Sequence, residues 1–171
     1  WESLGRVLAT DISSDINMPP FDKSAVDGYA CRKEDLDANL KVVEVIPAGQ
    51  MPKMEITQGL CSKIMTGAPV PKGANCVIMV EEVDEIDEQT IRYTGKYSKT
   101  NIAIFAEDVK EGDRVLSKGS LIEPQHIAIL AAVGVSNVAV SAKPKVSILV
   151  TGDELVEVSE KPNVGQIRNS N

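Results

Sequence analysis

The stretch of this sequence that says most about its fold is Pro19-Pro20-Phe21-Asp22-Lys23-Ser24-Ala25-Val26-Asp27-Gly28-Tyr29-Ala30. Its apolar residues follow neither the helical period of about 3.6 residues nor the two-residue period of a strand. The paired prolines stiffen its start and favour extended backbone before them. Gly28 permits a turn that a side chain would resist. We therefore expect a rigid loop here, not a simple core helix or strand.

Polar side chains gather between the prolines and Gly28. They are two carboxylates, an amine and a hydroxyl: Asp22, Asp27, Lys23 and Ser24. Groups that are already ordered lose less entropy on binding, so a rigid loop suits a binding or catalytic site. The alternative is a structural turn in which Asp and Ser side chains cap backbone amides and Lys23 is an ordinary surface residue. The residues by themselves leave both interpretations open.

The stretch resembles the Pro-Phe-Asp-x-Ser-x-x-Asp-Gly-Tyr-Ala signature of the MoeA family. These are the molybdenum-inserting enzymes of molybdenum-cofactor synthesis, and the E domain of gephyrin also belongs to them. Three further motifs resemble the same family in the same order along the chain: residues 64–71, Glu107-Asp108-Val109 with Gly112-Asp113, and residues 151–155 continuing to 165–171. Four ordered motifs over nearly the whole chain make a specific signal.

Composition and length describe an ordinary soluble globular protein. The chain has 171 residues, of which 43% are hydrophobic and 25% are charged, so it can bury a stable core. It has no apolar run of about 18 residues and no basic-then-apolar leader, so we expect no membrane span, no secretion and a cytoplasmic protein. The three cysteines, Cys31, Cys61 and Cys76, have no Cys-x-x-Cys spacing and are expected to be buried free thiols. Because the chain also has a single histidine, it lacks the usual set of zinc ligands, and we expect no zinc site.

The charge of the chain argues against nucleic acid as a partner. The net charge is −7, which opposes contacts with phosphate backbones. Acidic residues crowd at positions 81–88, where we expect an exposed, solvated hairpin. Molybdate and the cofactor phosphate are also anions. Local amides, lysines or a divalent cation must therefore overcome the repulsive background.

The pattern along the chain predicts a β-rich protein with little helix. Trp1, Leu4, Val7 and Leu8 predict a short opening helix. Residues 40–46 and 76–80 predict strands, the second buried on both sides. Glycines and prolines recur between such short strands, which is typical of a barrel-like region. A helix is expected from Pro124 to a cap at Gly134, followed by strands at 138–141 and 146–150.

The resemblance implies a division of this pattern into domains. In the family, a β-rich module is inserted into an elongated linker domain, and an α/β molybdopterin-binding domain follows. We therefore assign residues 1–13 and 113–143 to the linker domain and 14–112 to the inserted β-barrel-like domain. Residues 144–171 are assigned to the start of a truncated α/β domain, with its first strand. The expected fold class is mainly β with α.

Three further motifs offer polar groups for a site. Thr66 and Gly67 follow an apolar run and make either an anion cradle or a generic turn. The neighbouring acids Glu107 and Asp108 repel each other. Either a hard cation such as Mg²⁺ binds them, or both are exposed to solvent. Asp153-Glu154 repeats this arrangement at the carboxyl end of a predicted strand, where open α/β sheets bind ligands. Ser24 is a hydrogen-bond donor to a phosphate or a local cap. His126, inside the predicted helix, is rejected as a catalytic base.

The resemblance implies a reaction and roles for its matching positions. Adenylylated molybdopterin binds, the adenylate is hydrolysed, and molybdate is inserted into the dithiolene. Asp27 and Asp108 then orient substrate or metal, Thr66 donates to an oxyanion, and Glu154 helps to hold Mg²⁺. Asp153 is the neighbouring candidate metal ligand. The candidates for binding the cofactor are Ser24, Lys23 and Gly67.

One segment departs from the family pattern. The family usually carries arginine and other basic residues after the Asn-Ile that stands here as Asn101-Ile102, whereas this chain continues Ala103-Ile104-Phe105-Ala106. Lost guanidinium groups mean lost bidentate phosphate contacts. The alternative function is therefore a non-catalytic paralogue that binds the cofactor or organises partners. The resemblance also implies a homodimer with a site completed across subunits, and a chain that is inactive alone.

Overall fold

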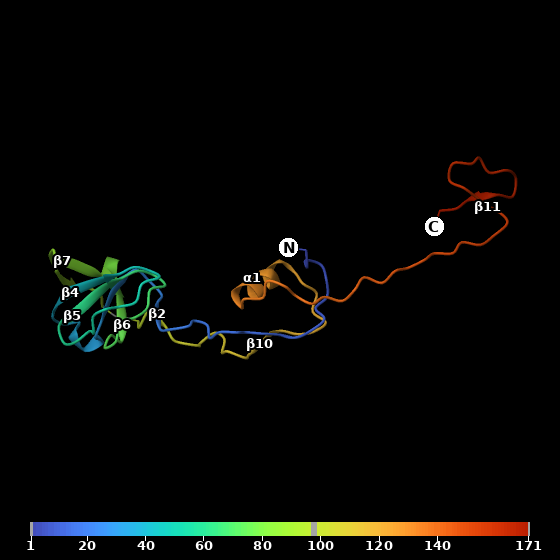
Figure 1. Cartoon of the computed structure of the whole chain (residues 1–171). Helices are drawn as coiled ribbons and strands as arrows, with labels where there is room; N and C mark the ends of the chain where they lie inside the picture. Colours follow the sequence, from blue (N-terminus) through green and yellow to red (C-terminus); the bar gives the residue numbers. More distant parts are fainter. Residues whose placement is uncertain (1, 97–98, 171) are drawn as a thin grey trace. The chain divides into compact units, whose positions relative to one another are not determined.

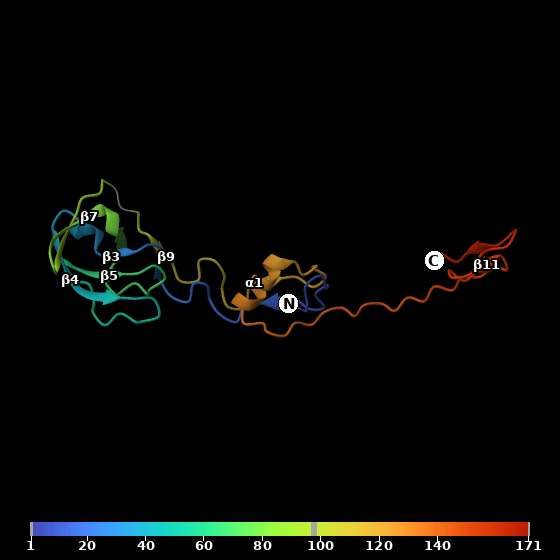
Figure 2. The same cartoon turned by 90° about the horizontal axis from the view of Figure 1, so that it is seen from above.

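The computed structural model describes residues 2–96 and 99–170 and divides the chain into two compact units, Trp1–Val140 and Ser141–Asn171. Figures 1 and 2 show the first unit as a β-rich part and a smaller part with the helix. The expected fold class, mainly β with α, is confirmed. Within the described ranges, no helix combines the length and the hydrophobicity that a membrane crossing requires.

A six-stranded sheet, curled into a half-barrel, forms the larger part of the first unit. Its strand order is β6-β3-β5-β4-β8-β7. The strands in chain order are β3 (Gly28–Cys31), β4 (Asn39–Ile46), β5 (Leu60–Ile64), β6 (Cys76–Met79), β7 (Val83–Asp87) and β8 (Thr90–Tyr93). Neighbours pair antiparallel except β4 and β5, which are parallel. Single-turn 3₁₀ helices at Lys33–Asp35 and Val80–Glu82 join strands.

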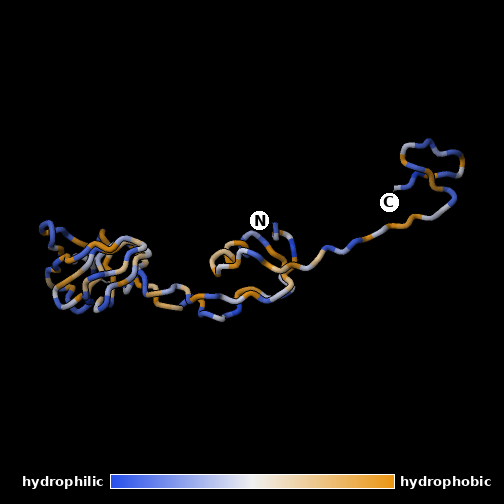
Figure 3. The backbone as a smooth tube through the Cα atoms, viewed as in Figure 1, coloured by the Kyte–Doolittle hydropathy of each residue, from blue (hydrophilic) through white to orange (hydrophobic). Residues whose placement is uncertain are grey.

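The sheet is covered on both faces at its centre. All four residues of β3 are buried, and alternate side chains enter different clusters: Tyr29 and Cys31 join one, Ala30 the other. This follows from the two-residue period of a strand. Figure 3 shows hydrophobic stretches interspersed with hydrophilic ones in the β-rich part. The strands predicted at 40–46 and 76–80 are confirmed as β4 and β6, and the acidic run forms the expected exposed hairpin of β7 and β8.

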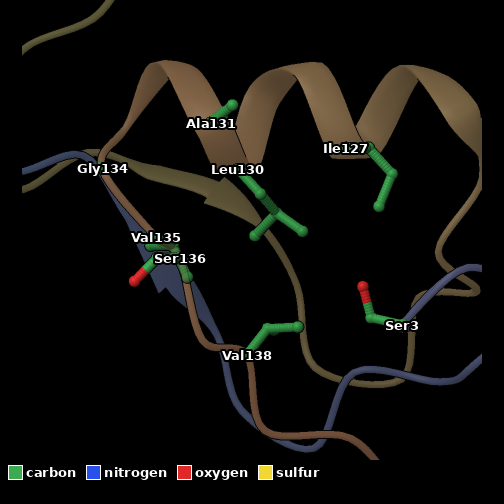
Figure 4. A pocket seen from close by; sticks show the side chains of 8 residues that line it. All are labelled: Ser3, Ile127, Leu130, Ala131, Gly134, Val135, Ser136 and Val138. Atoms are coloured by element: carbon green, nitrogen blue, oxygen red, sulfur yellow. The ribbon is translucent and has the colours of Figure 1, made fainter. Parts of the chain in front are cut away.

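The smaller part of the first unit contains α1 (Pro124–Ala132) and the antiparallel pair β1 (Ile12–Ser13) and β10 (Arg114–Leu116). The helix begins and ends as predicted, with Pro124 in its first turn and Gly134 at φ +74° after it. The ring of His126 accepts the N–H of Glu123, a capping contact. Leu130 and Val138 point into a pocket of about 320 Å³ beneath the helix (Figure 4).

The predicted opening helix is wrong. Residues 2–5 form turns, and Val7 and Leu8 make isolated bridges with Leu121 and Val140. The backbone N–H of Leu8 donates to the Ser120 carbonyl, so this segment pairs with a distant one instead of with itself. Tertiary pairing outweighs a weak helical pattern in so short a segment. Trp1 lies outside the described residues.

Two short antiparallel pairings order the signature stretch. β2 (Lys23–Ser24) pairs with β9 (Ile102–Ala103), and Met18 forms an isolated bridge with Val109. The Met18-Pro19 peptide bond is cis. The stretch is thus neither a regular helix nor one continuous strand, as expected.

The second unit contains β11 (Leu155–Val156) and β12 (Ile167–Arg168), which pair in parallel. Residues 146–150 do not form the strand expected there: Val146, Ile148 and Leu149 are 78%, 72% and 88% exposed. A strand requires partners for its backbone N–H and C=O groups, and no described segment pairs with this one. At 138–141, only the Val140 bridge forms.

Candidate functional site

The sheet brings Asp27 and Thr66 together. Asp27 immediately precedes β3, and Thr66 follows the end of β5 by two residues. Because Gly28 lies opposite Ile64 in this antiparallel pair, the two loops leave the sheet at the same end. The Asp27 Oδ1 accepts the backbone N–H of Thr66 and its hydroxyl, both at 2.7 Å. Both residues are exposed, so this carboxylate is fixed at the surface.

The two hydrogen bonds favour the charged form of Asp27. The backbone N–H of Thr66 makes the larger contribution and its hydroxyl the next, and together they hold the pKa of Asp27 below its ordinary value of 3.8. No described residue donates to the other carboxylate oxygen, Oδ2. Asp27 therefore offers an ionised, oriented oxygen to a ligand.

Gly28 is explained by close packing of strands. A Cβ at this position would collide with the carbonyl oxygen of Ile78 on β6 and lie 3.1 Å from the Val77 side chain. The expected reason, a turn that only glycine permits, is wrong, because Gly28 does not adopt a positive φ. The glycine instead lets β6 approach β3 closely, directly beside Asp27.

Ser24 and Lys23 belong to the backbone framework of the loop. Ser24 is 1% exposed, and its Oγ donates to the Val26 carbonyl at 2.6 Å and accepts the Val26 N–H at 3.4 Å. This is the local cap that the sequence left open as an alternative. Lys23 is half-buried and pairs with Ala103 in β9. The N–H of Gly67, whose φ is +82°, donates to the Ser24 carbonyl.

Asp22 and Asn101 hold neighbouring loops. The sequence left Asp22 open between a site residue and a cap of backbone amides, and it gave Asn101 no role. The Asp22 Oδ1 accepts the N–H of Phe105 at 2.7 Å, and the side-chain amide of Asn101 donates to the Val77 carbonyl at 2.8 Å. Asn101 has φ +49°, and its carbonyl accepts the N–H of Ala25. Asp22 stood inside the signature stretch. For Asn101, an Asn in a loop was the available signal, because Asn tolerates this backbone conformation better than most residues.

Asp108 makes no hydrogen bond with Asp27 or Thr66 and lines a pocket. Its N–H donates to the Met18 carbonyl, and its side chain lines a pocket of about 380 Å³ together with Arg114 and Ile129. Neither Asp27 nor Thr66 lines this pocket. The structure of this chain thus joins two of the three predicted catalytic residues directly, and the third lines a pocket to which neither of them contributes.

Asp153 and Glu154 lie in the turn before β11, in the second unit. The Glu154 carbonyl accepts the N–H of Ile167, which ties the turn to β12. Throughout residues 2–96 and 99–170, no three His, Cys, Asp or Glu side chains form a group that could hold a metal. Two neighbouring carboxylates still fit the usual chemistry of Mg²⁺, which is often held by one or two carboxylates with water and substrate phosphates.

Known proteins resemble this chain over almost its whole length. The proteins named molybdopterin molybdenumtransferase from Staphylococcus epidermidis and Staphylococcus aureus are 40% and 39% identical to it over 99% of the chain. The crystal structure of a molybdopterin biosynthesis MoeA protein from Pyrococcus horikoshii superposes with a TM-score of 0.83 and 46% identity over 93% of the chain.

These relatives are longer proteins. The chain spans 42% of the length of the staphylococcal proteins and 44% of the Pyrococcus chain. The family model described as MoeA N-terminal region (domain I and II) matches residues 1–134. The chain therefore belongs to the MoeA family.

Proposed function

We propose that this chain is part of an enzyme of molybdenum-cofactor biosynthesis, a molybdopterin molybdenumtransferase. The reaction is insertion of molybdate into adenylylated molybdopterin, with hydrolysis of the adenylate. Support comes from the family and from the names of relatives that match 99% of the chain. Because the chain spans 42% of those relatives, the activity is proposed for the whole protein.

The observation that carries the proposal is the fixed Asp27 carboxylate. Thr66 occupies Oδ1 with two hydrogen bonds, which leaves Oδ2 for a ligand. An oriented carboxylate at this position can hold a metal ion or a substrate hydroxyl without reorganising first. The hydroxyl of Thr66 has one hydrogen, which it already donates to Asp27. We therefore propose that Thr66 positions Asp27, since donation to an oxyanion would break this bond.

Mg²⁺ would be held by Glu154 and Asp153 and would supply positive charge to the phosphate and molybdate oxygens. Asp27 and Asp108 would orient the substrate. The framework residues Lys23, Ser24 and Gly67 would keep the loop next to the anion, with Lys23 also supplying positive charge. A homodimer is proposed as the assembly that completes the site.

The test measures molybdenum insertion by the full-length protein, with adenylylated molybdopterin, molybdate and Mg²⁺. Asp27→Asn keeps the shape of the side chain and removes its charge, and we expect turnover to fall by at least about tenfold. Glu88→Gln, an equal charge change on the exposed β7–β8 hairpin, is the matched control and should leave turnover unchanged. Equal turnover in Asp27→Asn and wild type would remove Asp27 from the mechanism.

A second candidate function is a non-catalytic protein that binds the cofactor or organises partners. The observation favouring it is the segment where the family usually has basic residues: Ile104 and Phe105 are 50% and 51% exposed there. Apolar side chains cannot replace guanidinium contacts to phosphate. Two results together would favour this function over the enzyme. The full-length protein would bind adenylylated molybdopterin in calorimetry, and it would form no product.

A further inference from the structure

The three cysteines of the chain lie side by side on three neighbouring strands. Cys31 is the last residue of β3, and the strand register places it opposite both Cys61 of β5 and Cys76, the first residue of β6. All three side chains are fully buried in one hydrophobic cluster. The sequence predicted buried free thiols, which is confirmed, but not that they would be aligned.

Cys31 and Cys76 are in direct contact. Their Sγ atoms are 3.5 Å apart and share a hydrogen bond, while Cys61 has no such sulfur partner among the described residues. Residues directly opposite on antiparallel strands have Cβ atoms about 4.5–5.5 Å apart. A disulfide requires about 3.5–4.5 Å, so a small approach of the two strands would allow the bond.

The thiols differ in acidity. The hydrogen bond from Cys31 lowers the pKa of Cys76, and the same contact, with burial, raises the pKa of Cys31. Burial raises the pKa of Cys61 to about 12. Cys76 is therefore the thiol that ionises first, and the thiolate is the form that attacks an oxidant.

The thiol pair lies where β3 ends and β6 begins. Leu36 and Tyr93 pack against its hydrophobic cluster and also line a pocket of about 380 Å³ together with Lys33. A local opening of these two side chains would admit a small uncharged molecule from the pocket into the cluster. Hydrogen peroxide fits this description, being small and uncharged.

We propose that Cys31 and Cys76 form an oxidation site that closes into a cross-strand disulfide when it reacts with hydrogen peroxide. The Cys76 thiolate attacks one peroxide oxygen, the O–O bond breaks, and the leaving oxygen takes a proton to become water. The resulting sulfenic acid is attacked by the sulfur of Cys31. The S–S bond forms, the S–O bond breaks, and a second water leaves. Two thiols are thus oxidised and one peroxide is reduced to two waters.

The test treats the purified, folded protein with hydrogen peroxide, labels the remaining thiols after denaturation, and maps peptides without reduction. We expect loss of two of the three free thiols, a mass decrease of two hydrogen atoms, and a Cys31–Cys76 linked peptide. Dithiothreitol should restore all three thiols. The matched variants are Cys61→Ala, which should still form the disulfide, and Cys76→Ala, which should not.

Any of three results would overturn the proposal. They are three intact thiols after peroxide treatment of the folded protein, a bond that includes Cys61, and a disulfide that forms only in denaturant. Because the peptide map is made on wild-type protein, it decides the question even if the Cys76→Ala variant fails to fold.

Discussion

Asp22 and Phe105 are joined by a hydrogen bond although they lie 83 residues apart in the chain. The Asp22 Oδ1 accepts the backbone N–H of Phe105 at 2.7 Å. The next residue, Ala106, has φ +57°, and its N–H donates to the Pro19 carbonyl. The signature stretch thus holds the segment that departs from the usual family sequence. The apolar replacement of basic residues sits on an ordered loop.

The Asp22→Ala variant should loosen this loop. Without the carboxylate, the N–H of Phe105 loses its acceptor, and hydrogen exchange at this amide should accelerate roughly threefold to tenfold. Exchange is measured by NMR or mass spectrometry on the folded protein. Glu107→Ala, in the same loop, is the control and should leave the Phe105 amide unchanged. Identical exchange in wild type and Asp22→Ala would mean that the hydrogen bond does not order the loop.

The Thr66→Val variant separates the two bonds that hold Asp27. It removes the hydroxyl and keeps the backbone N–H, which is the larger cause of the lowered pKa. The pKa of Asp27 should therefore rise toward 3.8 without reaching it, as measured by NMR titration of the carboxyl carbon. Thr66→Ser, which retains the hydroxyl, should keep the wild-type value. A pKa unchanged in Thr66→Val would show that the hydroxyl does not bond the carboxylate.

Local sequence patterns correctly predicted the helices and strands whose conformation does not depend on pairing with distant segments. β4, β6 and α1 were predictable because their apolar runs, Pro124 and Gly134 act within a few residues. The opening helix and the strand at 146–150 were mispredicted for the opposite reason. The opening segment pairs with residues far along the chain, and residues 146–150 pair with no described segment. Neither outcome can be read from a local pattern.

The candidate site divides in the same way. The sequence named Asp27 and Thr66, but their mutual hydrogen bonds depend on the register of β3 against β5, which no local pattern encodes. Likewise, Ser24 could be a ligand donor or a cap until the structure placed its hydroxyl on Val26. Gly28 was singled out for a turn, whereas the approach of β6 is its reason.

Stability should fall at acidic pH through exposed but hydrogen-bonded carboxylates. Asp11 accepts the Lys118 N–H at 2.6 Å, and this bond is the main cause of its lowered pKa. Since the folded-state pKa lies below the ordinary 3.8, the stabilisation is fully present above that value and is lost as pH falls through the folded-state pKa. The pKa of Asp27 is also lowered, so its contribution to stability is likewise lost as the pH falls.

Urea unfolding at pH 7 and at steps below pH 4 measures this dependence. In Asp11→Asn, the decline of the unfolding free energy below pH 4 should be shallower than in wild type, because one linked proton is gone. Asp113→Asn is not a suitable control, since its carboxylate also accepts a backbone N–H. Glu88→Gln is suitable and should retain the wild-type slope. A slope in Asp11→Asn as steep as in wild type would contradict the assignment.

Substituting Gly28 and Gly67 should separate collision from backbone strain. A Cβ at Gly28 meets the backbone carbonyl of Ile78, which cannot move without disturbing β6, so Gly28→Ala should cost about 1–3 kcal/mol or more. Gly67 has open space around it but φ +82°, so Gly67→Ala should cost about 1–2 kcal/mol through strain alone. Urea unfolding measures both costs.

The two variants also differ in where they act. Gly28→Ala should shift the amide resonances of β3 and β6. Gly67→Ala should shift only those of its own turn and of Ser24, whose carbonyl accepts the Gly67 N–H. A Gly28→Ala protein with wild-type stability would show that β6 does not pack as closely on β3 as the structure has it.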